Sequence, residues 1–147
     1  MEKKVIICLV LSVISLNLFS QGFKKSSNTE KIGSYELGNY HLYRHQADSI
    51  VVYSFDMRDK KYTSDHFLQV KLGTKEEAIA FFKNAIEAID TMKKGDRFEL
   101  GLPDGNVGFY TALLGVKKLG ITVGDIGEYG ELSKPVAKSM LKQIEKE

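Results

Sequence analysis

Cysteine is almost absent from the sequence, which contains a single one, Cys8, among 147 residues. Cys8 lies near the start of an apolar run, whereas a lipid-modified cysteine would lie at its end. If this run is removed during export, the mature chain has no thiol. Disulfide bonds, a thiolate nucleophile and cysteine-ligated zinc are then excluded. The fold must depend on a hydrophobic core, which about 125 residues can supply.

A long hydrophobic run is also missing. The longest one, residues 5–19, has 15 positions that include two serines and an asparagine, whereas a membrane span needs about 20 apolar residues. It follows a short, mainly basic start and precedes Ser20 and Gly22, small residues spaced as signal peptidase requires. The pattern predicts a cleaved signal peptide over residues 1–22, export to the periplasm or the extracellular space, and no stable membrane span after cleavage. A membrane anchor is the alternative.

The sequence lacks a strong excess of either charge. It contains 21 lysines and arginines against 19 aspartates and glutamates, and removal of residues 1–22 leaves 19 basic and 18 acidic residues. No run of lysines and arginines is dense enough to indicate a surface for nucleic acid or for an anionic membrane. The sequence therefore predicts no nucleic-acid partner.

Nucleotide-binding motifs are absent as well. Five glycines lie within residues 115–130, but their spacing matches neither a Walker loop nor a dinucleotide fingerprint. We interpret them as residues of turns and bulges. The sequence predicts no cofactor.

The polar residues 23–34 show little periodicity and predict a flexible tether, so that a single domain would span residues 35–147. Apolar residues then alternate with polar ones in residues 49–57 and 66–72, with a further β-rich stretch at residues 40–45. Turn-like residues separate these segments. The pattern predicts a three-stranded antiparallel meander.

Residues 74–95 carry the clearest helical pattern, because apolar residues recur there at spacings of three and four. Thr74 and Glu77 predict a capping box at the start of this helix. Gly95 predicts the end of the helix, because glycine readily adopts the left-handed backbone conformation found there. A second helix is predicted near the C-terminus, with Ser133 as its N-cap.

The segment between the two helices is less clear. Residues 98–102 and 107–113 predict a hairpin, and residues 119–126 a third strand; the alternative is a helix over residues 107–119, which its two internal glycines disfavour. The predicted fold class is therefore α+β, with an antiparallel sheet of five or six strands and two amphipathic helices. The order βββα would then occur twice. A duplication remains open, since any two capped amphipathic helices rich in lysine resemble each other.

His41 and His45 would lie on one face of a strand, because their spacing is even. They would be separated by about 13 Å, which is too far for both to bind one metal ion. The sequence therefore predicts no metal site. If the hairpins turn at residues 47–48 and 59–60, His41, Ser54 and Asp65 form a row across the meander. A catalytic triad needs the base in the middle, whereas this row has the serine there.

Tyr40 and Tyr53 are predicted to lie in the core under the first helix, whereas Tyr43 falls on the opposite face with His41, His45 and Phe67. Such side chains combine contact area with hydrogen-bonding groups and suit a partner, so these four are the candidate binding residues. The alternative is that the second half of the chain covers this face.

By elimination, the sequence predicts an exported, non-enzymatic binding module for a protein, a glycan or a small ligand. The alternative is a small extracytoplasmic hydrolase that uses His41, His45 or His66 with Asp65. A structural protein of the cell envelope is a third hypothesis, which the polar tether slightly supports.

We predict that N-terminal sequencing of the protein from its native host finds a chain that begins just after Gly22. Signal peptidase would have removed the apolar run. A cytosolic protein that still begins at Met1 would contradict both the predicted export and the absence of a thiol.

Overall fold

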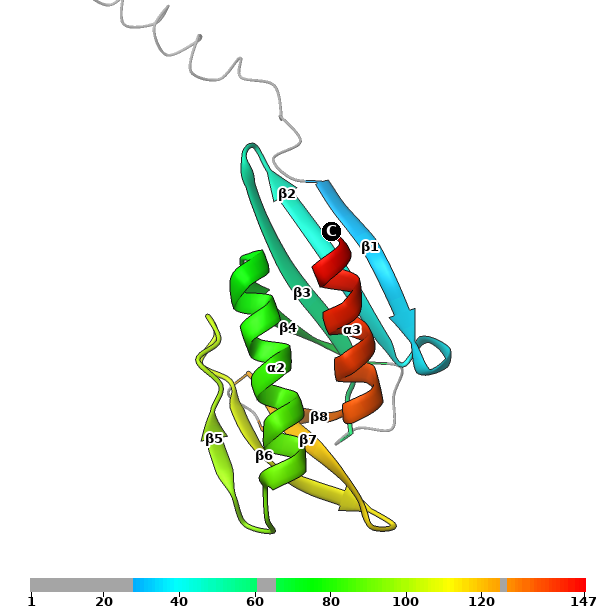
Figure 1. Cartoon of the computed structure of the whole chain (residues 1–147), viewed down its shortest axis with the longest axis vertical. Helices are drawn as coiled ribbons and strands as arrows, with labels where there is room; N and C mark the ends of the chain where they lie inside the picture. The colour runs from blue at the N-terminus through cyan, green and yellow to red at the C-terminus, as the bar shows by residue number, and fades with distance from the viewer. Residues whose placement is uncertain (1–27, 61–65, 125–126) are drawn as a thin grey trace, which may run out of the picture.

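The computed structural model describes residues 28–60, 66–124 and 127–147. In chain order the described elements are β1 (Asn28–Tyr35), η1 (Glu36–Gly38), β2 (Tyr40–Ala47), β3 (Ile50–Arg58), β4 (Phe67–Gly73), α2 (Lys75–Thr91), β5 (Arg97–Glu99), β6 (Val107–Leu113), β7 (Val116–Val123), β8 (Glu128–Ser133) and α3 (Lys134–Lys146). Figure 1 shows their arrangement. The predicted α+β class with two helices is confirmed.

The prediction of one sheet with five or six strands is wrong. The described strands form two four-stranded antiparallel sheets: sheet A, in the order β1-β2-β3-β4, and sheet B, in the order β5-β6-β7-β8. Each half of the chain therefore has the order ββββα. The predicted βββα order lacked one strand in each half.

The strand missing from the first half is β1. Residues 28–34, which were predicted to belong to a flexible tether, form most of this strand. It pairs with β2 from Asn28↔Gln46 to Tyr35↔Tyr40. β1 is an edge strand, and its side chains are mostly exposed, so its sequence has no apolar alternation. The predicted signal peptide and residues 23–27 of the predicted tether lie outside the described residues.

The strand missing from the second half is β8, which pairs with β7. Residues 107–113 form a strand, as the sequence favoured over a helix. The two halves also share a short sequence at equivalent places, Tyr-Glu-Leu-Gly at residues 35–38 and Phe-Glu-Leu-Gly at residues 98–101. Both glycines have a positive φ, 87° at Gly38 and 62° at Gly101, a conformation that glycine adopts without strain. The repeated order and this shared sequence support a duplication, although Glu36 and Leu37 have a positive φ and the matching Glu99 and Leu100 do not.

The capping box predicted for α2 is confirmed. The hydroxyl of Thr74 accepts a hydrogen bond from the backbone N–H of Glu77, and the Glu77 carboxylate accepts one from the N–H of Thr74. The helix ends at Thr91, with Met92 as its C-cap residue, rather than at Gly95. In α3, Ser133 is the N-cap residue, but its hydroxyl donates to the Glu36 carboxylate at 2.9 Å instead of capping the helix.

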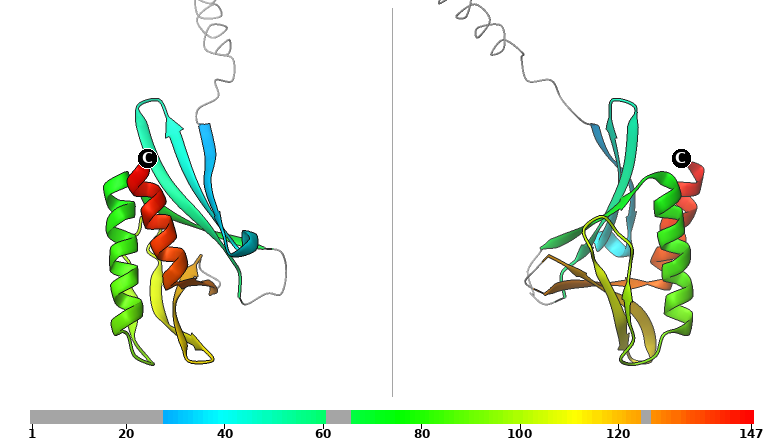
Figure 2. Two further views of the ribbon diagram at one scale, coloured as in Figure 1. Left: turned by 45° about the vertical axis from the view of Figure 1, so that its right-hand side comes forward. Right: turned by 90° about the vertical axis from the view of Figure 1, so that its left-hand side faces the viewer.

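Both helices lie on the same side of the two sheets (Figure 2). Helix α2 packs on β3 and β4 of sheet A and also on β7 of sheet B, whereas α3 packs on β8 and reaches back to β1. The helices also pack against each other. Because each helix contacts both sheets, their buried residues belong to one hydrophobic core, which includes Phe55, Phe82, Leu119 and Met140.

The two sheets meet where β3 passes β8. A Cβ atom on Gly130 would lie 2.5 Å from Cγ and Sδ of Met57, so the close approach requires glycine there. Next to this contact, the Tyr40 hydroxyl donates a hydrogen bond to the backbone carbonyl of Glu131. Burial, together with the charges of Glu36 and Glu131, raises the pKa of Tyr40, so the hydroxyl keeps its proton.

We predict that Gly130→Ala lowers the free energy of unfolding by about 1–3 kcal/mol, because the added methyl overpacks the contact with Met57. Met57→Ala alone should cost about 2–5 kcal/mol through the cavity that it leaves. In the double variant the new methyl occupies vacated space, so the combined loss should be smaller than the sum. Denaturant unfolding of the four proteins measures this coupling; additivity within about 0.5 kcal/mol would contradict the contact.

Candidate functional site

Sheet A has a second face, on the side opposite to the helices. Alternation places Leu42, Phe55 and Val70 in the core, so the residues between them point the other way. We call this side the outer face and define it by residues from all four strands: Thr29, His41, Tyr43, His45, Val52, Ser54, Asp56, Phe67, Gln69 and Lys71.

The four residues that the sequence predicted as binding residues come together on this outer face. The rings of His41 and Phe67 lie 5.2 Å apart between centroids, and Tyr43 lies 6.2 Å from His41 and 6.2 Å from His45. All four side chains are half-buried. They form a continuous row of rings that runs from β4 across to β2.

The predicted row of His41, Ser54 and Asp65 is wrong in its register. The hairpin turns at residues 48–49, one residue later than predicted, so His41 lies opposite Asp56 and Tyr43 lies opposite Ser54. A shift of two positions in the pairing leaves every side chain on its predicted face. Asp65 lies outside the described residues.

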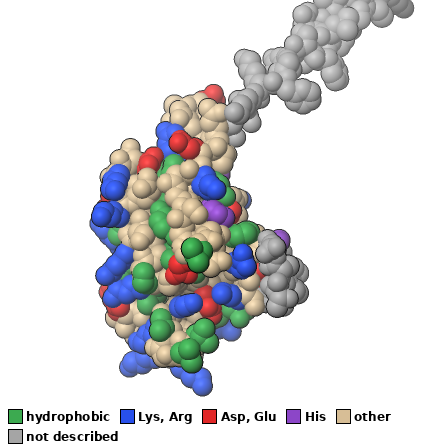
Figure 3. All heavy atoms as spheres, turned by 90° about the vertical axis from the view of Figure 1, so that its right-hand side faces the viewer, with side chains coloured by type: hydrophobic (Ala, Val, Ile, Leu, Met, Phe, Trp, Pro, Cys, Tyr) green, Lys and Arg blue, Asp and Glu red, His purple; other side chains and the backbone are tan. Residues whose placement is uncertain are grey.

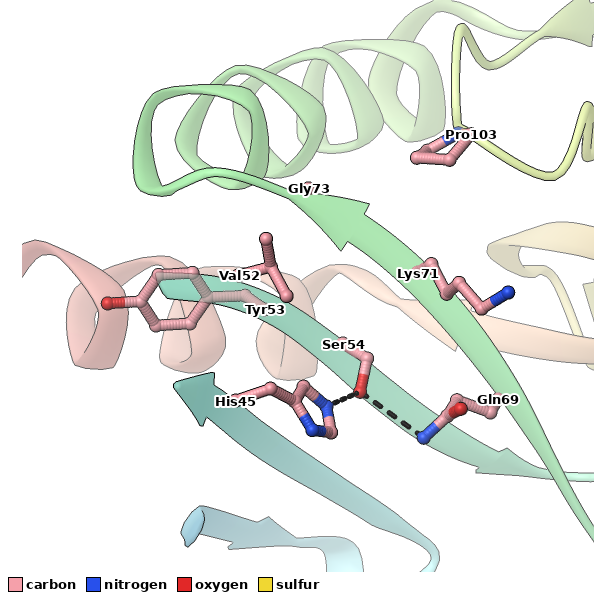
Figure 4. A pocket seen from close by; sticks show the side chains of 8 residues that line it. All are labelled: His45, Val52, Tyr53, Ser54, Gln69, Lys71, Gly73 and Pro103. Carbon is pink, nitrogen blue, oxygen red and sulfur yellow. Dashed lines mark hydrogen bonds between the residues drawn. The ribbon is translucent and has the colours of Figure 1, made fainter. Parts of the chain in front are cut away.

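A chain of hydrogen bonds crosses sheet A beside the row of rings. Nε2 of His45 lies 2.7 Å from the Ser54 hydroxyl, and Nδ1 of His45 lies 3.0 Å from the Thr29 hydroxyl. The side-chain amide of Gln69 donates to the Ser54 hydroxyl at 3.4 Å (Figure 4). Four residues from four strands are thereby linked, which fixes the orientation of the His45 ring.

The contact between His45 and Ser54 has the length of a nucleophile–base pair, but the rest of a triad is not in place. The orienting group on the other nitrogen of His45 is the hydroxyl of Thr29, where a triad has a carboxylate. Ser54 is only 2% exposed. His66, the third histidine of the hydrolase hypothesis, lies instead 4.0 Å from the Glu128 carboxylate on β8.

Asp56 is a half-buried carboxylate within the outer face. Burial raises its pKa, and the hydrogen bond from the Tyr43 hydroxyl and the positive charges that His41 and His45 can carry partly offset this rise. The pKa of Tyr43 is also raised, first by burial and then by the charge of Asp56. The two groups thus favour the state in which the tyrosine keeps its proton.

A pocket of about 340 Å³ opens at the end of the outer face that carries His45 (Figure 4). Its lining combines polar groups with apolar walls: His45, Val52, Tyr53, Ser54, Gln69, Lys71, Gly73 and Pro103. A β-bulge shapes it, because Tyr53 lies opposite Gly73 whereas Ser54 lies opposite Lys71. Pro103 comes from the loop between β5 and β6, where Asp104 pairs with Lys71 at 3.2 Å.

Sequence reasoning missed several residues of this site. Asp56, Gln69 and Lys71 follow from strand alternation once β3 and β4 are placed, so the signal was present in the sequence. Thr29 was missed because β1 was taken for a tether. Pro103 was missed because it comes from the other half of the chain, and no local pattern predicts that approach.

Within the described ranges, no helix is both long and apolar enough to cross a membrane. The same residues contain no group of three or more histidine, cysteine, aspartate or glutamate side chains that could hold a metal ion. No protein-family model matches the chain, and the searches of curated proteins and of solved structures give no significant match.

We predict that Asp56→Asn raises the free energy of unfolding at pH 7. The unfolded aspartate titrates near pH 3.9 and the folded one at a higher pH, so stability falls as pH rises through this window. Asparagine avoids that loss while still accepting the hydrogen bond from Tyr43. The gain should disappear below about pH 3.9, where both forms of the aspartate are neutral.

Denaturant unfolding between pH 3 and pH 7 measures this difference, with the exposed Glu145→Gln on α3 as the control. A variant that is less stable than the wild type at pH 7 would show that the histidines hold the carboxylate charged.

Proposed function

We propose that this protein is an exported binding module and that the outer face of sheet A, with its pocket, receives a small ligand rich in hydroxyl groups, such as a short glycan. The supporting observation is the continuity of the ring row with the pocket, since both share His45. The signal-peptide pattern of residues 1–22 supports export.

The size of the pocket supports a small ligand. Its volume of about 340 Å³ is at the lower end of the range of small-molecule sites, about 300–1,000 Å³. Val52 and Pro103 offer apolar walls, and the more accessible side chains of His45 and Gln69 offer hydrogen-bonding groups. Such a mixture suits a ligand that presents both C–H surface and hydroxyl groups.

The row of rings supports a sugar among the three ligand classes that the sequence left open. Aromatic rings provide flat apolar area at a low entropic cost, and tyrosine adds a hydroxyl. Beside the rings, Asp56 and Gln69 can exchange hydrogen bonds with sugar hydroxyls. The main cation of the pocket, Lys71, is already paired with Asp104, so the lining does not favour an anionic ligand.

A calorimetric screen of short neutral saccharides against the complete protein tests this proposal. We expect at least one saccharide to bind, and Gln69→Ala or Phe67→Ala to weaken its binding about tenfold, which corresponds to about 1.4 kcal/mol. The matched control is Gln143→Ala on α3, which lies outside the outer face and should leave binding unchanged. Absence of any saccharide binding, or equal losses in the control, would contradict the proposal.

Replacing all three histidines by alanine separates binding from catalysis. A binding module would lose affinity through His41 and His45, while His66→Ala alone should have no effect, because His66 lies beside Glu128. If the saccharide is instead cleaved, and His45→Ala abolishes cleavage in a folded protein, the hydrolase hypothesis replaces the binding module.

A further inference from the structure

The hairpin between β6 and β7 ends in exposed apolar side chains. Leu114 is 97% exposed, Leu113 62% and Val116 58%. Leu113 and Leu114 are adjacent, and only Gly115 lies between Leu114 and Val116. Three large apolar side chains within four residues thus project into solvent at one tip of sheet B.

The backbone of this turn makes the leucine unusual. Leu114 has a φ of 50° and Gly115 a φ of 81°, and turns with two such residues favour asparagine or aspartate at the first position. The equivalent hairpin of the first half places Asp48 there, with a φ of 52°. The fold thus requires a positive φ but no apolar side chain, and Leu114 contributes nothing to the core. Unfavourable conformations of this kind are concentrated at functional sites.

Basic residues lie at the same end of the molecule. Nζ of Lys117, next to the tip, donates to the backbone carbonyls of Asp90 and Met92 at the end of α2. The chain continues from there into Lys93 and Lys94, which are both exposed. Figure 1 shows the end of α2 and the hairpin tip together at the bottom of the molecule, and in Figure 3 hydrophobic and basic side chains share this lower end.

The acidic groups at this end are already engaged. The Asp90 carboxylate pairs with Lys134 on α3, and the Asp96 carboxylate accepts a hydrogen bond from the backbone N–H of Lys93. Asp96 keeps its negative charge in this hydrogen bond, but Lys93, Lys94 and Lys117 outnumber it at this end of the molecule. The fold creates this basic surface from residues that are dispersed in the sequence, which shows no dense basic run.

We propose that the β6–β7 tip is a docking element for an anionic membrane surface. Leu113, Leu114 and Val116 would enter the boundary between head groups and acyl chains, and the neighbouring lysines would lie against anionic head groups. Apolar side chains flanked by lysines have this effect on interfacial segments.

The shape of the tip favours a membrane over a protein partner. Stable protein interfaces bury about 800 Å² on each partner, whereas three side chains on a narrow convex turn offer much less. A membrane needs no complementary shape. The proposal stands on the hairpin alone and does not depend on what the outer face of sheet A binds.

Co-sedimentation with phosphatidylglycerol-containing vesicles tests the proposal, using the protein purified as its host produces it. We expect the wild type to bind these vesicles and to be released from them by high salt. It should not bind vesicles of phosphatidylcholine alone, because charge contributes to docking. Leu114→Asn should reduce the partition coefficient about tenfold or more. It should not lower the midpoint of thermal unfolding, since asparagine tolerates a positive φ better than leucine.

The matched control is Ile50→Asn at the exposed start of β3, next to the equivalent turn of the first half, where the side chain is 64% exposed. It should leave vesicle binding unchanged. Three results would overturn the proposal: no binding by the wild type, binding undiminished in Leu114→Asn, or an equal loss in Ile50→Asn. A wild-type dimer that Leu114→Asn converts to a monomer would likewise overturn it and assign the tip to self-association.

Discussion

The close packing of β3 against β8, which the missing side chain of Gly130 permits, is the constraint on which the rest of the structure depends. Met57 occupies the space that a larger residue would take, and Tyr40 and Ser133 add hydrogen bonds between the halves. With the sheets held together there, each helix can contact both of them. Two ββββα halves, each of a size at which an independent core is marginal, thereby share one.

This shared core determines which surfaces remain for function. Within the described residues both helices pack on the inner face of sheet A, and the outer face keeps its rings and Asp56 half-buried. The four strands hold His45 between Thr29 and Ser54, so the polar groups of the face are oriented before a ligand arrives. Pre-organisation of this kind lowers the entropic cost of binding. The second half of the chain completes the pocket with Pro103.

Local patterns in the sequence were sufficient where one side of an element is buried. They predicted α2 with its capping box, strands β2 to β4, and a common face for His41, Tyr43, His45 and Phe67. That face survived an error of register because the error was an even number of residues. They were insufficient for β1, an exposed edge strand, and for the division into two sheets, which depends on pairing between distant segments. The position of Pro103 in the pocket was not predictable either, because it depends on the packing of the second half of the chain against the first.

Native-state hydrogen exchange tests the central claim, that the two halves share one core, most directly. The account predicts that the most protected amides of β3 in sheet A and of β7 in sheet B exchange with the same opening free energy, equal to that of global unfolding. Gly130→Ala should lower both values by the same amount. Exchange from β7 at a clearly lower free energy, with β3 unaffected by the substitution, would mean that the halves unfold separately and would contradict the account.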